Sequence, residues 1–540
     1  MPTINLNKWI LQDMTGLNEQ ELVDYLFKLK SEVSPVSQDE YSIEVNADRL
    51  DMLSLGGIVR ALKGITGKEL GEPSYPVKDT DYILEVEKVT SRPYALACVV
   101  YNVKLSPDFY LKELIQFQEK LHDTIGRRRK KVAIGIHDLE KVEGKIIRYA
   151  PVSLSTTFIP LNQEREMSVR DVLQETPQGK QYGNISVWDS NSPAIMDERG
   201  ILSVPPVINS DRTKITGNTK SLLIDVTGTN FESVMETMDL LATALAELGG
   251  IIGRVKVRGM SVDRSPVLRH TSVPFSLDDV NKRLGIHVSR DEAINLIRMM
   301  RMEVETNKDL AVIVPPYRVD IMNYTDVAED IAMAYGYDRF TLESGRTASR
   351  GSLSEKSEIY RKLRTLLVGA GFQEVYTLVL TKSSYQRGEA VNIANPISVE
   401  YDSVRNSLLW NSLVFLSNNQ HSRFPVRIFE IGDVVNRDES KDTKYSNSTR
   451  LSMAIMDSRV SYEMLQAPLH EVLLNLLGVA PSYRRFESDI FMKGRSAEVV
   501  VKGETIGRLG EANPELLRSF GLLYPVLLAE LDLDALRRVM

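Results

Sequence analysis

The chain has 540 residues, of which 43% are hydrophobic and 26% are charged, and these proportions are ordinary for a globular protein of roughly three to five domains. Its net charge of −7 excludes a protein that binds polyanions over its whole surface, so nucleic acid would have to meet local basic patches. The single cysteine, Cys98, cannot form an internal disulfide, no apolar run approaches the ~20 residues of a membrane span, and the first residues do not resemble a signal peptide. We therefore expect a cytoplasmic protein without membrane association.

Residues 1 to 85 are expected to form an N-terminal domain. Residues 44–54 read Glu-Val-Asn-Ala-Asp-Arg-Leu-Asp-Met-Leu-Ser, in which Asn46 or Asp48 is predicted to cap a helix. A capped amphipathic helix accounts for the physics of this string in full. The apolar stripe of the predicted helix consists of Leu53, Ile58 and Leu62.

Residues 86 to 268 mix predicted strands and helices. The strand at 222–227 reads Leu-Leu-Ile-Asp-Val-Thr, and its period places Asp225 and Thr227 on one face. Upstream, residues 202–211 read Leu-Ser-Val-Pro-Pro-Val-Ile-Asn-Ser-Asp. On the residues alone, a half-exposed strand that leads into an Asx or Ser turn is favoured over a catalytic pocket.

A run of five basic residues follows a predicted helix at 111–122. The run is Arg127-Arg128-Arg129-Lys130-Lys131. Because a helix C-terminus attracts cations, plain capping explains the run as well as contact with phosphate does, and the two interpretations carry equal weight.

Residues 269 to 345 are predicted to form a winged-helix-like unit. Ser276 and Ser289 are expected to cap two short helices, which precede a strand at 310–314. By shape this unit would suit a helix-turn-helix reader of DNA. The second helix carries little basic surface, however, so a structural role is favoured.

Within this unit, residues 315–338 form the most informative segment. Two prolines force an extended entry, and Thr325 is the predicted N-cap of a helix that ends at Gly336. On local chemistry alone, a solvated acidic helix face is favoured over a site for a hard cation. Four carboxylates are nevertheless expected to converge, and gathered like charges need a cation or a basic partner; they belong to Asp320, Asp326, Glu329 and Asp330.

Residues 346 to 540 are predicted to form a last α/β unit, with a helix at 354–367 and a strand at 371–380. Asn395-Pro, Arg405-Asn-Ser-Leu and Arg427-Ile-Phe-Glu-Ile-Gly resemble the core of a class II aminoacyl-tRNA synthetase. The arginine pattern that such a core needs for ATP phosphates is degraded near residues 510–518. The resemblance therefore implies a catalytically silent copy of that core.

Taken together, these strings resemble the phenylalanyl-tRNA synthetase β-subunit family of archaeal and eukaryotic type. Residues 315–338, with PPYRVD, DVAED and AYGYD, resemble its B5 signature, and the N-x-x-R-x-D-x-x-S pattern at 46–54 resembles its B1 signature. LSVPPVINS and IDVTGT resemble its B3/B4 editing domain. The resemblance implies an α+β multidomain fold with a B1-like domain (1–85), a B3/B4-like editing domain (86–268), a winged-helix-like B5 domain (269–345) and a catalytically silent class II synthetase-like antiparallel-sheet domain (346–540).

The resemblance also implies a function. A β subunit of this family supports the ATP-dependent attachment of phenylalanine to tRNA(Phe) by a separate α subunit, within an (αβ)₂ heterotetramer. It also hydrolyses mischarged Tyr-tRNA(Phe). This second step is needed because an apolar pocket for phenylalanine rejects the added hydroxyl of tyrosine only weakly. Mg²⁺, shared with the α subunit, would be held by Asp320, Asp326, Glu329 and Asp330. The implied editing residues are Asp225, Thr227 and Ser210 as catalytic candidates, and Leu202, Pro205 and Asn209 for substrate binding.

Two other functions remain open at this point. The first is a structural or tRNA-binding partner of the α subunit that does not edit. The second is a free-standing winged-helix nucleic-acid binder, which the acidic charge balance disfavours. No histidine is an obvious general base for editing, since His137, the nearest in sequence, lies at a strand end where a lone histidine is usually structural.

Overall fold

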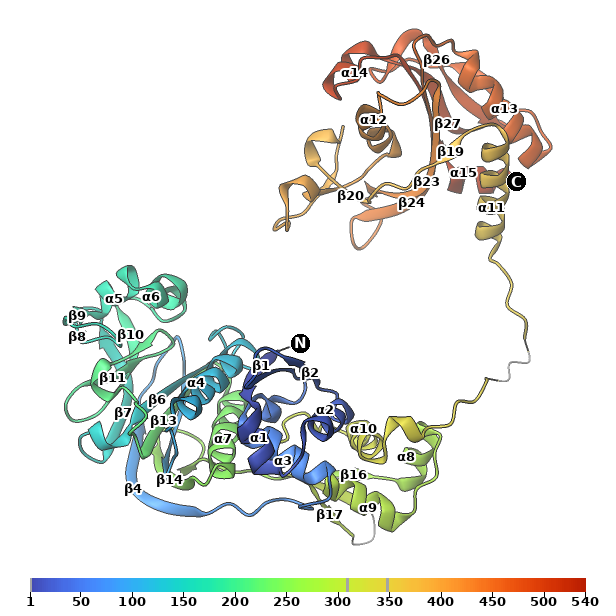
Figure 1. The fold of residues 1–540 in the computed structure, drawn as a ribbon. Helices are drawn as coiled ribbons and strands as arrows, with labels where there is room; N and C mark the ends of the chain where they lie inside the picture. The colour runs from blue at the N-terminus through green and yellow to red at the C-terminus, as the bar shows by residue number, and fades with distance from the viewer. Residues whose placement is uncertain (1, 307–309, 346–348) are drawn as a thin grey trace. The chain divides into compact units, whose positions relative to one another are not determined.

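The structure is a computed structural model that describes residues 2–306, 310–345 and 349–540. The chain divides into two compact units, unit 1 (Met1–Ser344) and unit 2 (Gly345–Met540) (Figure 1). Both combine helices with largely antiparallel sheets, which confirms the predicted α+β multidomain fold. In the part of the chain that is described, no helix is both long and apolar enough to cross a membrane.

The N-terminal part of unit 1 is a three-stranded antiparallel sheet in the order β1-β3-β2, with three helices. The predicted cap at Asn46 or Asp48 is wrong. Ser54 caps the helix instead, because its side chain accepts a hydrogen bond from the Gly57 N–H after a short 3₁₀ turn. The elements are β1 (Thr3–Asn7), α1 (Lys8–Thr15), α2 (Glu19–Lys28), β2 (Glu32–Pro35), β3 (Glu40–Glu44) and α3 (Leu55–Ile65).

The middle of unit 1 is a ten-stranded sheet in the order β12-β11-β10-β7-β4-β14-β5-β13-β6, with β15 paired to β14. Helices α4 and α7 pack on one of its faces. The strands are β4 (Val77–Val86), β5 (Tyr94–Tyr101), β6 (Val132–Asp138), β7 (Ile146–Ser153), β10 (Asn191–Met196), β11 (Ile201–Val204), β12 (Ile208–Asn209), β13 (Ser221–Gly228), β14 (Ile251–Arg258) and β15 (Arg264–Ser265). The helices are α4 (Asp108–Asp123), α5 (Val169–Glu175), α6 (Pro177–Tyr182) and α7 (Phe231–Glu247), and a small pair of strands is formed by β8 (Thr157–Phe158) and β9 (Met167–Ser168).

Strand β13 is a central strand, and the expected half-exposed strand is therefore wrong. It lies between β5 and β6, and every residue after Ser221 is buried. Leu222, Ile224 and Val226 belong to the core under α4 and α7. Leu223 packs in a separate apolar cluster on the opposite face of the sheet. Both faces of β13 are covered, which buries Asp225 with them.

The two ends of the strand order come back together, because the sheet curls. Strand β12 begins the order and β6 ends it, yet the Asn209 side-chain amide on β12 donates to the Ile136 carbonyl on β6 at 3.2 Å. Arg129, just before β6, donates to the carbonyls of Pro206 and Val207, just before β12, also at 3.2 Å. The curled sheet thus brings its two edges to face each other.

The last part of unit 1 has the expected winged-helix-like form, with Ser276 and Ser289 as N-caps of its first two helices. For the third helix the predicted N-cap Thr325 is wrong. Asn323 caps it, in a capping box with Asp326 that satisfies backbone N–H groups in both directions. The elements are β16 (Thr271–Phe275), α8 (Leu277–Leu284), α9 (Arg290–Met299), β17 (Glu303–Glu305), β18 (Leu310–Val314) and α10 (Tyr324–Tyr335).

Unit 2 is a seven-stranded sheet in the order β19-β23-β24-β28-β27-β26-β25, accompanied by a three-stranded sheet in the order β20-β22-β21. The strand predicted at 371–380 is mostly irregular, and only two residues of it pair with β23. The helices are α11 (Glu355–Gly369), α12 (Leu408–Asn418), α13 (Glu463–Leu477), α14 (Pro514–Ser519) and α15 (Leu533–Arg538). The strands are β19 (Gln373–Glu374), β20 (Leu380–Thr381), β21 (Val391–Asn392), β22 (Ser403–Val404), β23 (Val426–Arg437), β24 (Tyr445–Met456), β25 (Ser482–Arg485), β26 (Phe491–Val501), β27 (Glu504–Ala512) and β28 (Val526–Asp532).

A buried carboxyl group on α4 makes the stability of unit 1 depend on pH. Glu113 accepts a hydrogen bond from the Leu55 N–H at 2.6 Å, and burial raises its pKa from 4.5 to about 7. The folded chain therefore holds this proton more tightly than the unfolded chain does. Its contribution to stability is greatest below pH 4.5, declines as the pH rises toward 7, and is constant above.

We expect Glu113→Gln to remove this decline, because the amide keeps the acceptor oxygen without the charge. By calorimetry, the variant should equal the wild type near pH 4 and exceed it by up to about 3 kcal/mol at pH 8. Glu140→Gln, at an exposed carboxylate, serves as the control. An equal difference at both pH values would show that folding does not raise the pKa of Glu113.

Candidate functional site

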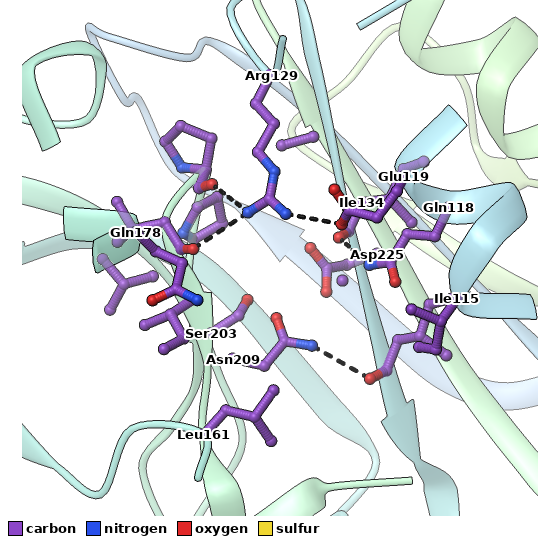
Figure 2. A pocket seen from close by; sticks show the side chains of 18 of the residues that line it. Ile115, Gln118, Glu119, Arg129, Ile134, Leu161, Gln178, Ser203, Asn209 and Asp225 are labelled. Carbon is purple, nitrogen blue, oxygen red and sulfur yellow. Dashed lines mark hydrogen bonds and ion pairs between the residues drawn. The ribbon is translucent and has the colours of Figure 1, made fainter. Parts of the chain in front are cut away.

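A cavity of about 370 Å³ lies where the two edges of the curled sheet face each other. Its volume suits a small organic group. Figure 2 shows polar side chains gathered in the middle of the cavity from three strands: Ser203 on β11, Asn209 on β12 and Asp225 on β13. Most of the wall is apolar and includes Leu111, Ile115, Ile134, Leu161, Val204, Pro205 and Ile208.

Asp225 is the charged group at the floor of the cavity. Its Oδ2 lies 2.9 Å from Nε2 of His137, and Nδ1 of the same ring lies 2.8 Å from the Thr213 hydroxyl. All three side chains are buried. Gly135 faces Asp225 across the β6–β13 pair, and a Cβ atom at that position would collide with the Asp225 carboxylate. The carboxylate is thus fixed from two sides, and His137 is its direct partner.

Ser203 is a second buried polar group in the cavity lining. It is 2% exposed, and its hydroxyl has no hydrogen-bond partner among the described residues. Oδ1 of Asp225 likewise accepts no hydrogen bond from any side chain or backbone group in the described ranges. Unsatisfied buried polar atoms are costly, so a ligand with a polar end would gain by meeting both atoms.

The structure separates the six predicted pocket residues into two groups. Asp225, Pro205 and Asn209 line the cavity, whereas Leu202, Thr227 and Ser210 do not. Leu202 packs in the apolar cluster that also contains Leu223 of β13. Ser210 caps the 3₁₀ turn that carries Thr213, and Thr227 is held by the buried Arg92, which binds its carbonyl at 2.7 Å and its hydroxyl at 3.3 Å. Both therefore support groups that touch Asp225 or its strand.

Arg129 and Glu119 form the charged rim of the cavity. The Arg129 Nη2 group donates to Glu119 Oε1 at 2.8 Å, and its guanidinium lies 4.8 Å from the centre of the Tyr182 ring. Burial by itself raises the pKa of Glu119, but the hydrogen bond from His122 and the charge of Arg129 lower this pKa to about 2. The rim pair therefore stays ionised at neutral pH.

The sequence suggested that the four carboxylates near α10 gather around a common point. In the structure they do not. Arg318 lies between two of them, since its guanidinium donates to Asp320 at 2.7 and 2.9 Å and to Asp330 at 2.6 and 3.1 Å. Burial by itself lowers the pKa of Arg318, but the charges of these two carboxylates hold this pKa well above its ordinary value. An internal cation thus occupies the place where a metal ion was expected.

The other two carboxylates are engaged separately. Asp326 accepts from the N–H groups of Met322 and Asn323 at the start of α10, at 2.8 and 2.9 Å, and Glu329 forms an ion pair with Lys30. Among the described residues no cluster of three or more potential ligands suits a metal ion. Within this chain, the four residues therefore do not fit a magnesium ion that all of them would bind.

Sequence reasoning missed Gly135, Ser203 and the role of His137. Neighbouring side chains of a strand point to opposite faces. The position of Ser203 on β11 could therefore have been inferred once the orientation of Leu202 was known. No local signal identifies His137 or Gly135, because both reach Asp225 only through the pairing of β6 with β13.

Three family models match successive parts of the chain. They are the B3/4 domain at residues 113–244, the tRNA synthetase B5 domain at 273–337, and the phenylalanyl-tRNA synthetase beta chain CLM domain at 341–533. The first of these contains most of the cavity lining, including Asp225. The fold and these matches define a chain of the aminoacyl-tRNA synthetase class.

Curated relatives narrow this class. A phenylalanine–tRNA ligase β subunit of Metallosphaera sedula is 99% identical over the whole of both chains, and that of Sulfurisphaera tokodaii is 50% identical, again over the whole of both. A solved N-terminal fragment of the phenylalanyl-tRNA synthetase β subunit from Pyrococcus horikoshii has a TM-score of 0.60 and 33% identity, and the match covers 62% of this chain and 100% of the fragment. The chain belongs to the phenylalanine–tRNA ligase β-subunit family.

The arrangement around Arg318 predicts that this ion cluster stabilises unit 1 without metal. Arg318→Met should lower the free energy of unfolding by about 3–5 kcal/mol, because it leaves two carboxylates buried without a cation. Arg165→Met, which breaks an exposed pair with Glu175, should cost less than about 1 kcal/mol.

Thermal unfolding of the isolated chain, with and without a chelator, measures both effects. The chelator should leave the melting temperature of the wild type unchanged. A clear fall on chelation would mean that a bound metal ion, rather than Arg318, holds these carboxylates together.

Proposed function

We propose that the cavity is an editing site that hydrolyses mischarged Tyr-tRNA(Phe). The observation that carries this proposal is the buried, unsatisfied hydroxyl of Ser203 together with the Asp225 carboxylate, inside a mostly apolar cavity of about 370 Å³. An aromatic ring fills the apolar part, and its hydroxyl donates to Asp225. Tyrosine has this combination of groups.

Phenylalanine fits the same walls but offers these two groups no hydrogen bond. A site built to hydrogen-bond a substrate hydroxyl rejects an analogue that lacks it by as much as ~10⁴-fold, because its buried polar groups remain unpaired. The cavity therefore favours the mischarged tyrosyl ester over the correct phenylalanyl ester. Correctly charged Phe-tRNA(Phe) passes without hydrolysis.

In this proposal Asp225 contacts the substrate, whereas Thr227 and Ser210 position the groups around it. His137 holds the carboxylate in place from behind and keeps one of its oxygens occupied. Pro205 and Asn209 shape the cavity wall, and Leu202 supports β11 by packing in the apolar cluster that contains Leu223. Hydrolysis then rests on the positioning of the ester and water rather than on a strong base.

We further propose that unit 2 docks on the α subunit of phenylalanine–tRNA ligase. An apolar band runs along residues 376–401, where Tyr376 is 84%, Leu378 57% and Val399 71% exposed. Exposed apolar side chains gathered in this way mark a protein interface. In the complex, an (αβ)₂ assembly in the cytoplasm, the α subunit uses ATP to charge tRNA(Phe).

Magnesium belongs to this assembled state. Arg318 binds Asp320 and Asp330, Asp326 accepts from two backbone N–H groups, and Glu329 pairs with Lys30. An ion shared with the α subunit would therefore have to replace some of these contacts. The alternative function, a partner of the α subunit that does not edit, retains the apolar band. It gives no role to the buried polar groups of the cavity.

Replacement of Asp225 tests the editing proposal. Asp225→Asn should reduce kcat/KM for the hydrolysis of Tyr-tRNA(Phe) by about 100-fold, the loss of one charge-assisted hydrogen bond of about 3 kcal/mol. The ratio of activity on Tyr-tRNA(Phe) to that on Phe-tRNA(Phe) should fall with it. Gly135→Ala should act likewise by displacing the carboxylate, whereas Asp278→Asn, at an exposed carboxylate of α8, should change nothing. Equal hydrolysis by wild type and Asp225→Asn would favour the non-editing partner.

Replacement of the apolar band tests the docking proposal. The double variant Leu378→Asp/Val399→Asp should fold normally but lose stoichiometric co-purification with the α subunit, because the interface would then bury two charges. Leu523→Asp, at an apolar side chain of unit 2 that is 84% exposed, provides the matched control. Retention of the α subunit by the double variant would place the interface elsewhere.

A further inference from the structure

The five-residue basic run forms a left-handed turn beside the cavity. Arg127, Arg128 and Arg129 have φ angles of 48°, 54° and 61°, three successive side-chain-bearing residues in the region that L-residues rarely adopt. Such strain persists only where the surrounding structure imposes it, and it concentrates at functional positions.

A buried arginine holds this turn. The side chain of Arg92 is 0% exposed, and its Nη1 group donates to the carbonyls of Arg129 at 3.0 Å and Lys130 at 3.5 Å. Its Nη2 group donates to the Thr227 carbonyl at 2.7 Å. Arg92 thus ties the turn directly to β13, two residues from Asp225, so the turn and the cavity floor form one rigid piece.

The basic side chains of the turn do not cap the helix before it. The last carbonyl groups of α4 are satisfied by backbone N–H groups, those of Thr124, Gly126 and Arg129. Among the described residues, the side chains of Arg127, Arg128 and Lys130 are exposed and form no ion pair or hydrogen bond. Capping therefore leaves these three cations unexplained.

We propose that Arg127, Arg128 and Lys130 bind the phosphates at the single-stranded 3′ end of the tRNA whose ester lies in the cavity. This inference rests on the proposed editing function. Arg129 belongs to the same turn and lines the cavity, so a ligand chain that leaves the cavity passes its neighbours. The chain as a whole carries a net charge of −7, and a polyanion therefore requires a local group of unpaired cations such as this one. Arginine suits phosphate because its guanidinium binds two oxygens at once.

The experiment compares two substrates that carry the same tyrosyl ester, Tyr-tRNA(Phe) and 2′(3′)-O-tyrosyl-adenosine, which lacks phosphates. The full-length variant Arg127→Asn/Arg128→Asn removes two charges with a residue that tolerates a left-handed turn. Lys282→Gln/Arg283→Gln removes two exposed charges from α8 and serves as the matched control.

We expect the turn variant to raise KM for Tyr-tRNA(Phe) by about tenfold at low salt with little change in kcat, and to hydrolyse tyrosyl-adenosine like the wild type. Between 50 and 200 mM salt, KM of the wild type should rise about sevenfold more than KM of the variant, the effect of two single-strand phosphate contacts. The α8 control should behave like the wild type on both substrates.

Three results would overturn the inference while leaving editing intact: an unchanged KM on Tyr-tRNA(Phe), an equal loss on both substrates, or the same loss in the α8 control. The second of these would show that the arginines only maintain the cavity. If the wild type hydrolyses neither ester, the editing proposal fails, and this inference fails with it.

Discussion

The fold of unit 1 depends on buried arginine–carboxylate pairs that join distant parts of the chain. Asp51 accepts hydrogen bonds from Arg49 and Arg60, each at 2.9 Å, and all three side chains are buried. Arg60 also reaches Glu247 at the end of α7 at 3.3 Å, and its guanidinium lies 3.6 Å from the centre of the Tyr317 ring. Arg318, the residue after Tyr317, forms a second cluster, in which it binds the carboxylates of Asp320 and Asp330. Each buried charge is tolerated only because its partner is present, so the N-terminal part, the large sheet and the winged-helix-like part must assemble together.

The same constraint shapes the cavity. A sheet that curls until its edges meet needs both faces supported, and α7, which Glu247 anchors, covers one of them. At the meeting edges, short polar contacts replace a strand ladder, and the gap between them becomes the cavity. Its floor is a carboxylate with one oxygen bound by His137 and one left free. A ligand with a hydrogen-bonding group would therefore gain more in this interior than a purely apolar one.

The two units give the chain two kinds of surface. Unit 1 carries a largely apolar cavity with a charged rim, which suits chemistry on a small group at the end of a larger ligand. Unit 2 carries a class II synthetase-like sheet and an exposed apolar band, which suits a protein partner. A β subunit that edits and assembles needs both properties. The left-handed basic turn adds a third, because it places unpaired cations at the cavity without raising the overall charge of an acidic chain.

The sequence by itself determined the elements that depend on local chemistry. The caps at Ser276 and Ser289, the alternation of β13 and the α+β class all follow from short-range periodicity and side-chain hydrogen bonding. Family signatures in their expected order predicted the family whose models match residues 113–244, 273–337 and 341–533. Local patterns failed where a partner came from elsewhere in the chain: Asp330 met Arg318, Glu329 met Lys30, and Asp225 met His137. Only the tertiary structure decided these pairings, because the charge and hydrogen-bond requirements of a buried group are satisfied by its neighbours in space, which sequence spacing does not specify.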